Sequence, residues 1–189
     1  MGRFLDKFLD KFLRQERFKK TKKHIPGNSV VCDLGCGKDA QFLKSMLGFI
    51  RQGIGLDGAT EDYKDSKLEL KKIKIEKNLP LDDESCDIIT IVAFIEHLSY
   101  PQEVLNECFR CLKPAGKLII TAPTPLAKPV LEFLAHYLHL IDEKEIGDHK
   151  NYFWPQNLKQ MILRAGFNRG NVKSCFFELF FNNLTIAKK

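Results

Sequence analysis

The run VVCDLGCG at residues 30–37 constrains the fold of this chain more than any other feature. Its β-branched and apolar residues are typical of a buried strand, and an acid, Asp33, precedes the glycines Gly35 and Gly37. Glycine permits a tight turn after a strand and lets a ligand approach the main chain closely. The run therefore predicts an α/β sheet with a ligand site where this strand ends.

A second apolar strand, GIGLD, ends in another acid, Asp57, twenty residues past Gly37. An acid at this position of a nucleotide-binding α/β sheet accepts hydrogen bonds from ribose hydroxyls. The carboxylate of Asp33 would repel a pyrophosphate but attract an ammonium group. The two acids favour a ligand with a cationic head and a ribose, such as S-adenosylmethionine. The alternative is a plain strand-to-helix turn with a solvated Asp33.

The composition fits one soluble domain of 189 residues. The longest apolar run, residues 88–95, is interrupted only by Thr90 and has the length of a buried strand. Most of the six cysteines lie in apolar elements, and the charged N-terminus has no secretory apolar segment, so we expect a cytoplasmic protein with reduced thiols. We expect no metal site, because Cys108-x-x-Cys111 has no second ligand pair.

The positive charge belongs to an N-terminal arm. Residues 1–24 hold nine Lys or Arg and three Asp or Glu, a surplus of six that equals the net charge of the whole chain, +6. The remaining domain is formally neutral, which disfavours a nucleic-acid groove. One half of the arm's helical wheel is apolar, formed by Phe4, Leu5, Phe8, Leu9, Phe12 and Leu13. This amphipathic helix could pack on its own domain or on a dimer partner, act as a cofactor lid, or touch an anionic membrane surface. The oligomeric state stays open.

We place the arm at residues 1–27 and the domain at residues 28–189. Strands and helices alternate along this domain. We expect strands at 29–34, 52–56, 71–75, 86–94 and 117–121, and helices at about 40–47, 101–112 and 155–165. Two β-rich runs, 172–180 and 184–187, should form a closing hairpin that turns at Asn182-Asn183. The pattern predicts a doubly wound, mostly parallel, seven-stranded Rossmann-like sheet with an antiparallel hairpin and a helical insert at about 124–152. Ligands of such sheets bind at the carboxyl ends of the strands.

Four segments in this order, VVCDLGCGKDA, GIGLDG, LPLDDESCDIITIVAFIEHL and LNECFRCLKPAGKLIITAP, resemble the class I S-adenosylmethionine-dependent methyltransferases of the small single-domain type. The resemblance covers residues 28–123 strongly. Residues 124–189 are similar to the C-terminal part of small methyltransferases, including a DHKNY-like loop. It implies that the protein transfers a methyl group from S-adenosylmethionine to an acceptor.

The resemblance also implies site residues. The cofactor-binding positions would be Asp33, Gly35, Cys36, Gly37, Asp57, Gly58, Glu76, Asn78, Leu79, Ala93 and Phe94. Glu96 and His97 would line the mouth of the site, unless they only cap the end of the strand. Two positions depart from the family: Asp39 replaces the third glycine of the first motif, and Lys74 stands close to where the family often has an adenine-binding acid.

Methyl transfer from a sulfonium needs alignment and exclusion of water, and a base only when the acceptor must lose a proton. His149, with Tyr152 close by in the DHKNY loop, is a hypothetical general base, and a structural hydrogen bond is the alternative. The apolar insert and the aromatic C-terminal region favour a small-molecule or lipid-linked acceptor. Two other functions stay open: a non-catalytic S-adenosylmethionine-binding regulatory protein and a dinucleotide-dependent oxidoreductase.

Overall fold

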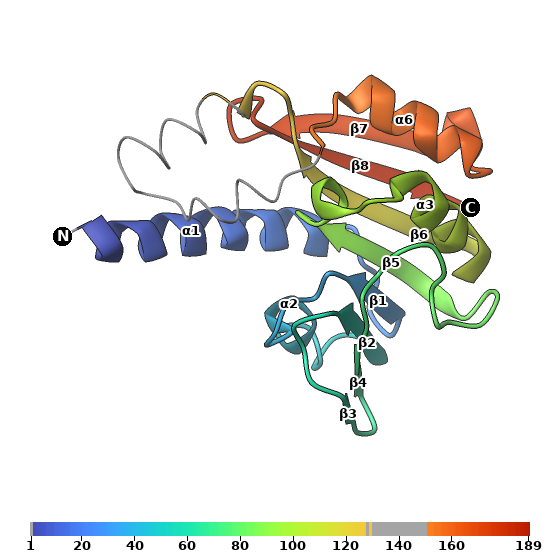
Figure 1. The fold of residues 1–189 in the computed structure, drawn as a ribbon. Coiled ribbons are helices and arrows are strands. Elements are labelled where there is room, and N and C mark those ends of the chain that lie inside the picture. Colours follow the sequence, from blue (N-terminus) through green and yellow to red (C-terminus); the bar gives the residue numbers. More distant parts are fainter. Residues whose placement is uncertain (1, 128, 130–150) are drawn as a thin grey trace.

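A computed structural model describes residues 2–127, 129 and 151–189, with side chains of the first helix from residue 12 onward. Its centre is one eight-stranded sheet with the strand order β3-β4-β2-β1-β5-β6-β8-β7 (Figure 1). The strands are β1 (Val30–Leu34), β2 (Gln52–Asp57), β3 (Tyr63–Lys64), β4 (Leu68–Lys72), β5 (Cys86–Val92), β6 (Leu112–Pro123), β7 (Val172–Phe177) and β8 (Asn182–Lys188). The α-helices are α1 (Gly2–Lys22), α2 (Gln41–Lys44), α3 (Pro101–Cys111) and α6 (Pro155–Arg164).

The central strands β4, β2, β1, β5 and β6 pair in parallel. The β7–β8 hairpin pairs with β6 in the antiparallel sense. At the opposite end of the strand order, β3 pairs with β4, also antiparallel. The predicted doubly wound, mostly parallel sheet with a closing hairpin is therefore confirmed. The strand beyond the predicted seven is β3, which is only two residues long.

Several predicted boundaries are wrong: the helix expected at 40–47 is α2, which ends at Lys44, and the strand expected at 117–121 is β6, which begins at Leu112. The strand expected at 71–75 is β4, which begins at Leu68 because Leu68 and Leu70 alternate with polar residues and bury one face. The hairpin does not turn at Asn182-Asn183, since both residues lie in β8. The Asn183 side chain is buried and donates to the carbonyls of Ala122 (3.0 Å) and Phe153 (3.2 Å), so this asparagine joins elements inside the fold.

Helices cover both faces of the sheet (Figure 1). On one face, α3 and α6 bury a core that includes Val104, Leu105, Leu158 and Ile162. On the other face, α2 packs on β2 and the C-terminal half of α1 packs on β5 and β6, with Phe18 against Phe42 at a ring-centroid distance of 4.9 Å. The C-terminal half of the basic arm thus packs on its own domain.

The carboxyl ends of the parallel strands form one edge of the sheet, which we call the carboxyl edge; the opposite edge is the amino edge. The register pairs Pro123, the last residue of β6, with Asn182, the first residue of β8, so the turn between β7 and β8 also lies at the carboxyl edge. The N-terminal half of α1 extends past the sheet on this side (Figure 1). Among the described residues, no helix combines the length and apolarity needed to cross a bilayer. Most of the predicted insert, including His149, lies outside the described residues.

Candidate functional site

Asp33 is a buried carboxylate near the end of the central strand β1. Its side chain is only 2% exposed, and its Oδ1 accepts a hydrogen bond of 2.6 Å from Thr90 Oγ1 on the neighbouring strand β5. Burial raises the pKa of Asp33 to about 7; the Thr90 hydrogen bond opposes the rise, and the charge of Asp57 adds to it. A cation beside Asp33 would favour its ionised form, so the position suits a positively charged ligand group.

The backbone conformation of the turn after β1 explains why two of its residues are glycines. Gly35 and Gly37 have φ angles of +75° and +71°, which residues with a side chain rarely adopt. A Cβ at Gly35 would lie 2.1 Å from Cγ of Phe94, so the Phe94 side chain lies directly against this glycine. A Cβ at Gly37 would meet no atom within 4 Å. Gly37 therefore leaves an open side on which a ligand could approach the main chain.

Asp57, at the end of β2, joins the two loops that border this opening. Its Oδ2 accepts from the Gly37 amide at 2.8 Å, and its Oδ1 accepts from the Ala59 amide at 2.7 Å. The side chain is half-buried and each oxygen keeps a second acceptor position, so the carboxylate can still accept hydrogen bonds from hydroxyl groups. The neighbouring Gly58 is exposed.

The other predicted cofactor positions differ in environment. The Cys36 side chain is buried in the core between β1 and α2, which leaves only its main chain for a ligand. Glu76 is exposed and pairs with Lys74 at 2.6 Å, and Asn78 is also exposed. Leu79 is a core residue whose amide donates to Glu107 Oε2 at 2.9 Å. At this corner of the site the main chain and the exposed side chains are the groups open to a ligand.

The end of β5 continues into a short helical turn that carries the predicted mouth of the site. Ala93 has a left-handed φ of +49°, and its amide donates to both the carbonyl (3.0 Å) and the hydroxyl (3.1 Å) of Thr121. Glu96 is buried, and the His97 ring lies 6.3 Å from that of Phe94. The strained residue thus turns the chain so that the segment 94–97 lies beside the glycine turn.

Tyr152 lies at the same edge. The residues on either side of it are anchored, since the Asn151 amide donates to the Glu96 carbonyl and the Phe153 amide donates to the Pro123 carbonyl, both at 3.2 Å. The start of the segment after the insert therefore crosses the carboxyl edge next to Glu96. Its predicted partner, His149, lies outside the described residues.

Thr90 is the site residue that sequence reasoning did not assign. Its hydroxyl is buried and contacts both Asp33 and the carbonyl of Cys32. The signal was present, because Thr90 is the one polar residue in an otherwise apolar run. A buried hydroxyl needs a hydrogen-bond partner, and an acid on the next strand was the obvious candidate.

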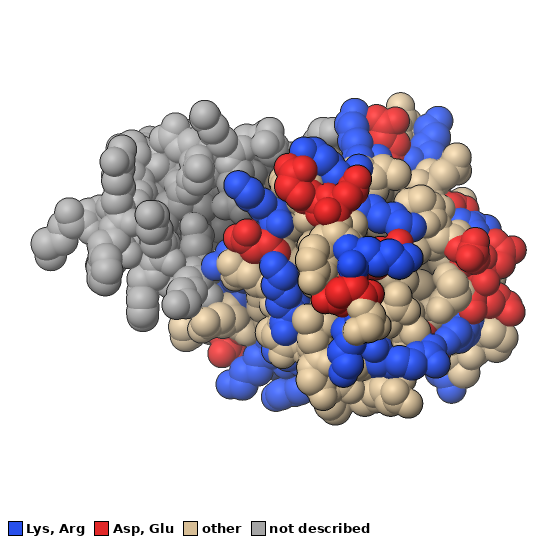
Figure 2. Space-filling view, turned by 90° about the horizontal axis from the view of Figure 1, so that it is seen from below, with Lys and Arg blue, Asp and Glu red and all other residues tan. Residues whose placement is uncertain are grey.

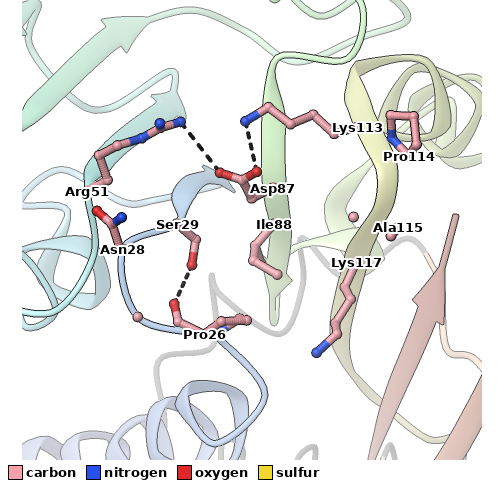
Figure 3. A pocket seen from close by; sticks show the side chains of 12 residues that line it. Pro26, Asn28, Ser29, Arg51, Asp87, Ile88, Lys113, Pro114, Ala115 and Lys117 are labelled. Carbon is pink, nitrogen blue, oxygen red and sulfur yellow. Dashed lines mark hydrogen bonds and ion pairs between the residues drawn. The ribbon is translucent and has the colours of Figure 1, made fainter.

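A pocket of about 350 Å³ lies at the amino edge of the sheet, away from this site (Figure 3). Arg51, Lys113 and Lys117 contribute to its wall, and Asp87 already binds Lys113 Nζ at 2.8 Å and pairs with Arg51 at 3.7 Å. A lining with more cations than anions repels ammonium and sulfonium groups. This pocket does not fit the ligand that the carboxyl edge fits.

Charges are mixed on the face of the domain that Figure 2 draws. In Figure 2, Lys and Arg alternate with Asp and Glu over the visible surface and form no continuous basic groove. Within the described ranges, no group of three or more His, Cys, Asp and Glu side chains is placed to hold a metal ion.

Comparisons with known proteins agree with this geometry. A family model described as "Methyltransferase domain" matches residues 32–120. A ubiquinone biosynthesis O-methyltransferase of Psychrobacter arcticus is 23% identical over 190 residues, covering 92% of this chain and 70% of the relative. A solved S-adenosylmethionine-dependent methyltransferase of Archaeoglobus fulgidus has a TM-score of 0.66 at 22% identity, covering 93% of this chain and 94% of that one.

The same fold occurs in a complex of the Trm112 methyltransferase activator of Haloferax volcanii with a methyltransferase, at a TM-score of 0.68 and 17% identity, with 97% of this chain and 96% of that one covered. Residues 32–120 match a methyltransferase domain, and the sheet has the fold of solved S-adenosylmethionine-dependent methyltransferases. Together these findings support a class I S-adenosylmethionine-dependent methyltransferase with S-adenosylmethionine as its cofactor. The buried acid, the open glycine turn and the second acid fit the charged tail and the ribose of that cofactor.

Proposed function

We propose that this protein transfers the methyl group of S-adenosylmethionine to a hydroxyl oxygen of a small, apolar or lipid-linked acceptor. The observation that carries the proposal is the buried Asp33, bound by one hydroxyl and next to the open side of Gly37, at the carboxyl edge of a methyltransferase sheet. The relatives named O-methyltransferases support oxygen as the acceptor atom.

Within this proposal, different residues of the carboxyl edge bind different parts of the cofactor. Asp33 faces the ammonium of the methionine tail, and the Gly35–Gly37 turn lets the tail lie against the main chain. The free acceptor positions of Asp57 take the ribose hydroxyls. The main chain near Asn78, together with Ala93 and Phe94, borders the adenine, since the Glu76 carboxylate is already paired with Lys74.

When bound, the cofactor supplies an electrophilic methyl group whose leaving group is a neutral thioether. The acceptor oxygen forms the new bond to the methyl carbon, and the electron pair of the broken carbon–sulfur bond stays on sulfur. The residues at the mouth must hold the acceptor oxygen in line and exclude water. The hydroxyl proton must also leave, and we assign its removal to His149, with Tyr152 orienting the acceptor.

The surface around the mouth supports an apolar acceptor. Leu126, at the start of the insert, and Trp154, just after its end, are 48% and 38% exposed. Exposed apolar side chains beside a site favour an acceptor with apolar surface to bury.

Transfer of a labelled methyl group tests the proposal. The acceptors should be two catechols with the same ring, one with a long alkyl tail and one with a short hydroxylated chain. We expect a kcat/KM at least tenfold higher for the tailed catechol, and a large loss of kcat in His149→Ala with a smaller loss in Tyr152→Phe. Equal turnover of both catechols would contradict an apolar acceptor. Full turnover by His149→Ala would reject the base. Tight binding of S-adenosylhomocysteine without transfer to any acceptor would favour a regulatory role.

A further inference from the structure

The end of β7 and the turn between β7 and β8 expose apolar side chains, and the other residues that the structure describes leave them uncovered. Leu179 is 82% exposed, Phe180 61% and Phe176 41%, and the rings of Phe176 and Phe180 contact each other at a centroid distance of 5.4 Å. We call these three residues the apolar tip. Leu126, 48% exposed, lies two residues beyond Thr124, which is hydrogen-bonded to the turn. Contiguous exposed apolar groups of this kind mark interaction surfaces.

The backbone of the apolar tip is strained. Glu178, Leu179 and Phe180 have φ angles of +50°, +53° and +71°, a run of three left-handed residues without glycine. The turn is nevertheless fixed, because the hydroxyl and the amide of Thr124 donate to the carbonyls of Phe180 and Phe181, both at 2.8 Å. The fold thus holds large apolar side chains outward in an unfavourable conformation, which is the pattern expected of a functional surface.

The basic helix α1 lies close to this tip. Burial raises the pKa of the half-buried Glu178, within the tip's own turn, and the charges of Arg17, Glu16 and Lys20 on α1 also act on this carboxylate. At 1.5 Å per residue, α1 continues roughly 20 Å from Arg17 to its N-terminus, and this part projects past the carboxyl edge (Figure 1). Phe12, on the half of the helical wheel that is apolar, is 52% exposed there. Apolar and basic groups therefore stand together on one side of the molecule.

We propose that the apolar tip and α1 form a docking face for an anionic lipid bilayer. Charge complementarity selects this occupant: residues 1–24 carry the whole surplus of six positive charges, while the rest of the chain is formally neutral. The apolar tip enters the headgroup boundary, and the lysines and arginines of α1 bind lipid phosphates. Docking in this way turns the carboxyl edge, where the methyl acceptor enters, toward the membrane. The inference rests on the proposed function only in that it explains how a lipid-linked acceptor would arrive.

Co-sedimentation of the full chain with vesicles tests the docking face. The vesicles are phosphatidylcholine alone and phosphatidylcholine with phosphatidylglycerol. We expect binding to the anionic vesicles that weakens with added salt, and at least tenfold weaker partitioning for Leu179→Ser combined with Phe180→Ser. Arg14→Gln combined with Lys19→Gln should weaken binding by roughly fivefold for each charge removed.

Matched controls distinguish binding through the docking face from nonspecific adsorption to vesicles. Phe49, 57% exposed in the loop before β2 at the amino edge, is replaced by serine, and the exposed Lys173 of β7 by glutamine. Both controls should partition like the unchanged protein. All variants should bind S-adenosylhomocysteine equally, so a failed docking face remains distinguishable from a failed methyltransferase assignment. Equal binding to neutral and anionic vesicles, or no effect of the tip substitutions, would overturn the proposal. A tip-dependent dimer without lipid would instead assign the face to a second copy of the chain.

Discussion

Asp33 and Asp87 are acids on the neighbouring strands β1 and β5, and the fold treats them in opposite ways. Asp87, at the amino edge, accepts from the Val30 amide at 2.7 Å and from Lys113 Nζ at 2.8 Å. Burial alone would raise the pKa of Asp87, but these bonds and the charge of Arg51 outweigh it and lower the pKa. Asp33, at the carboxyl edge, has one hydroxyl donor, and burial raises its pKa to about 7. The protein thus pairs Asp87 with a main-chain donor and two cations, whereas Asp33, which we propose faces the cofactor, has no positively charged partner among the described residues.

The largest expected difference between the two acids is in cofactor binding. Asp33→Asn should weaken the binding of S-adenosylhomocysteine by about 100-fold, because it removes the charge that faces the ammonium group. Asp87→Asn should change the affinity by less than about twofold, since Asp87 lies at the opposite edge of the sheet. Isothermal titration calorimetry measures both. Similar losses in the two variants would show that the acids do not differ in the way described.

Replacing Asp33 and replacing Asp87 should change the free energy of unfolding in opposite directions. Because folding raises the pKa of Asp33 from 3.8 to about 7, its favourable contribution is complete below pH 4 and is lost as the pH rises through 7. At pH 8 the ionised group costs on the order of 4 kcal/mol, so Asp33→Asn should stabilise the protein there. Asp87 stabilises above its unfolded pKa and loses this contribution in acid, so Asp87→Ala should destabilise by about 1–2 kcal/mol at pH 8. Urea unfolding at pH 8 gives both values. A destabilised Asp33→Asn would contradict the account.

Replacing Thr90 should have a smaller effect on cofactor affinity. This replacement sharpens the comparison because it changes only the hydrogen-bond partner of Asp33. Thr90→Val removes the hydroxyl that opposes the rise in the pKa of Asp33, so more of the carboxyl is protonated at pH 7. We expect about tenfold weaker S-adenosylhomocysteine binding at pH 7 and a smaller loss at pH 9. Thr90→Ser, which keeps the hydroxyl, is the control and should bind within about threefold of the unchanged protein. A loss that does not depend on pH would mean that Thr90 acts only through packing.

The sequence predicted the parts of the fold that local rules control. Strand β1, the glycine turn and helix α3 follow from apolar runs, from glycine and from Pro101 at the first turn of a helix. It misplaced the hairpin turn because Asn183 reads as a turn residue, whereas its buried side chain bonds two segments that only the folded sheet brings together.

Prediction of the candidate site from the sequence met the same limit. The positions of Asp33 and Asp57 at strand ends were predictable, but the partners of these acids were not. Thr90 reaches Asp33 only through the pairing of β1 with β5, and Asp57 reaches the Gly37 amide only across two loops. Contacts between residues far apart in the chain depend on the register of the sheet, which a single sequence does not state.

Proton release on cofactor binding tests the central claim most directly. Binding of the ammonium group of S-adenosylhomocysteine should ionise Asp33, so calorimetry near pH 6.5, in buffers with different ionisation enthalpies, should report release of a substantial fraction of one proton. The release should fade above pH 8 and vanish in Asp33→Asn. Binding without proton release at pH 6.5, or the same release in Asp33→Asn, would show that Asp33 is not the group that receives the positive charge of the cofactor.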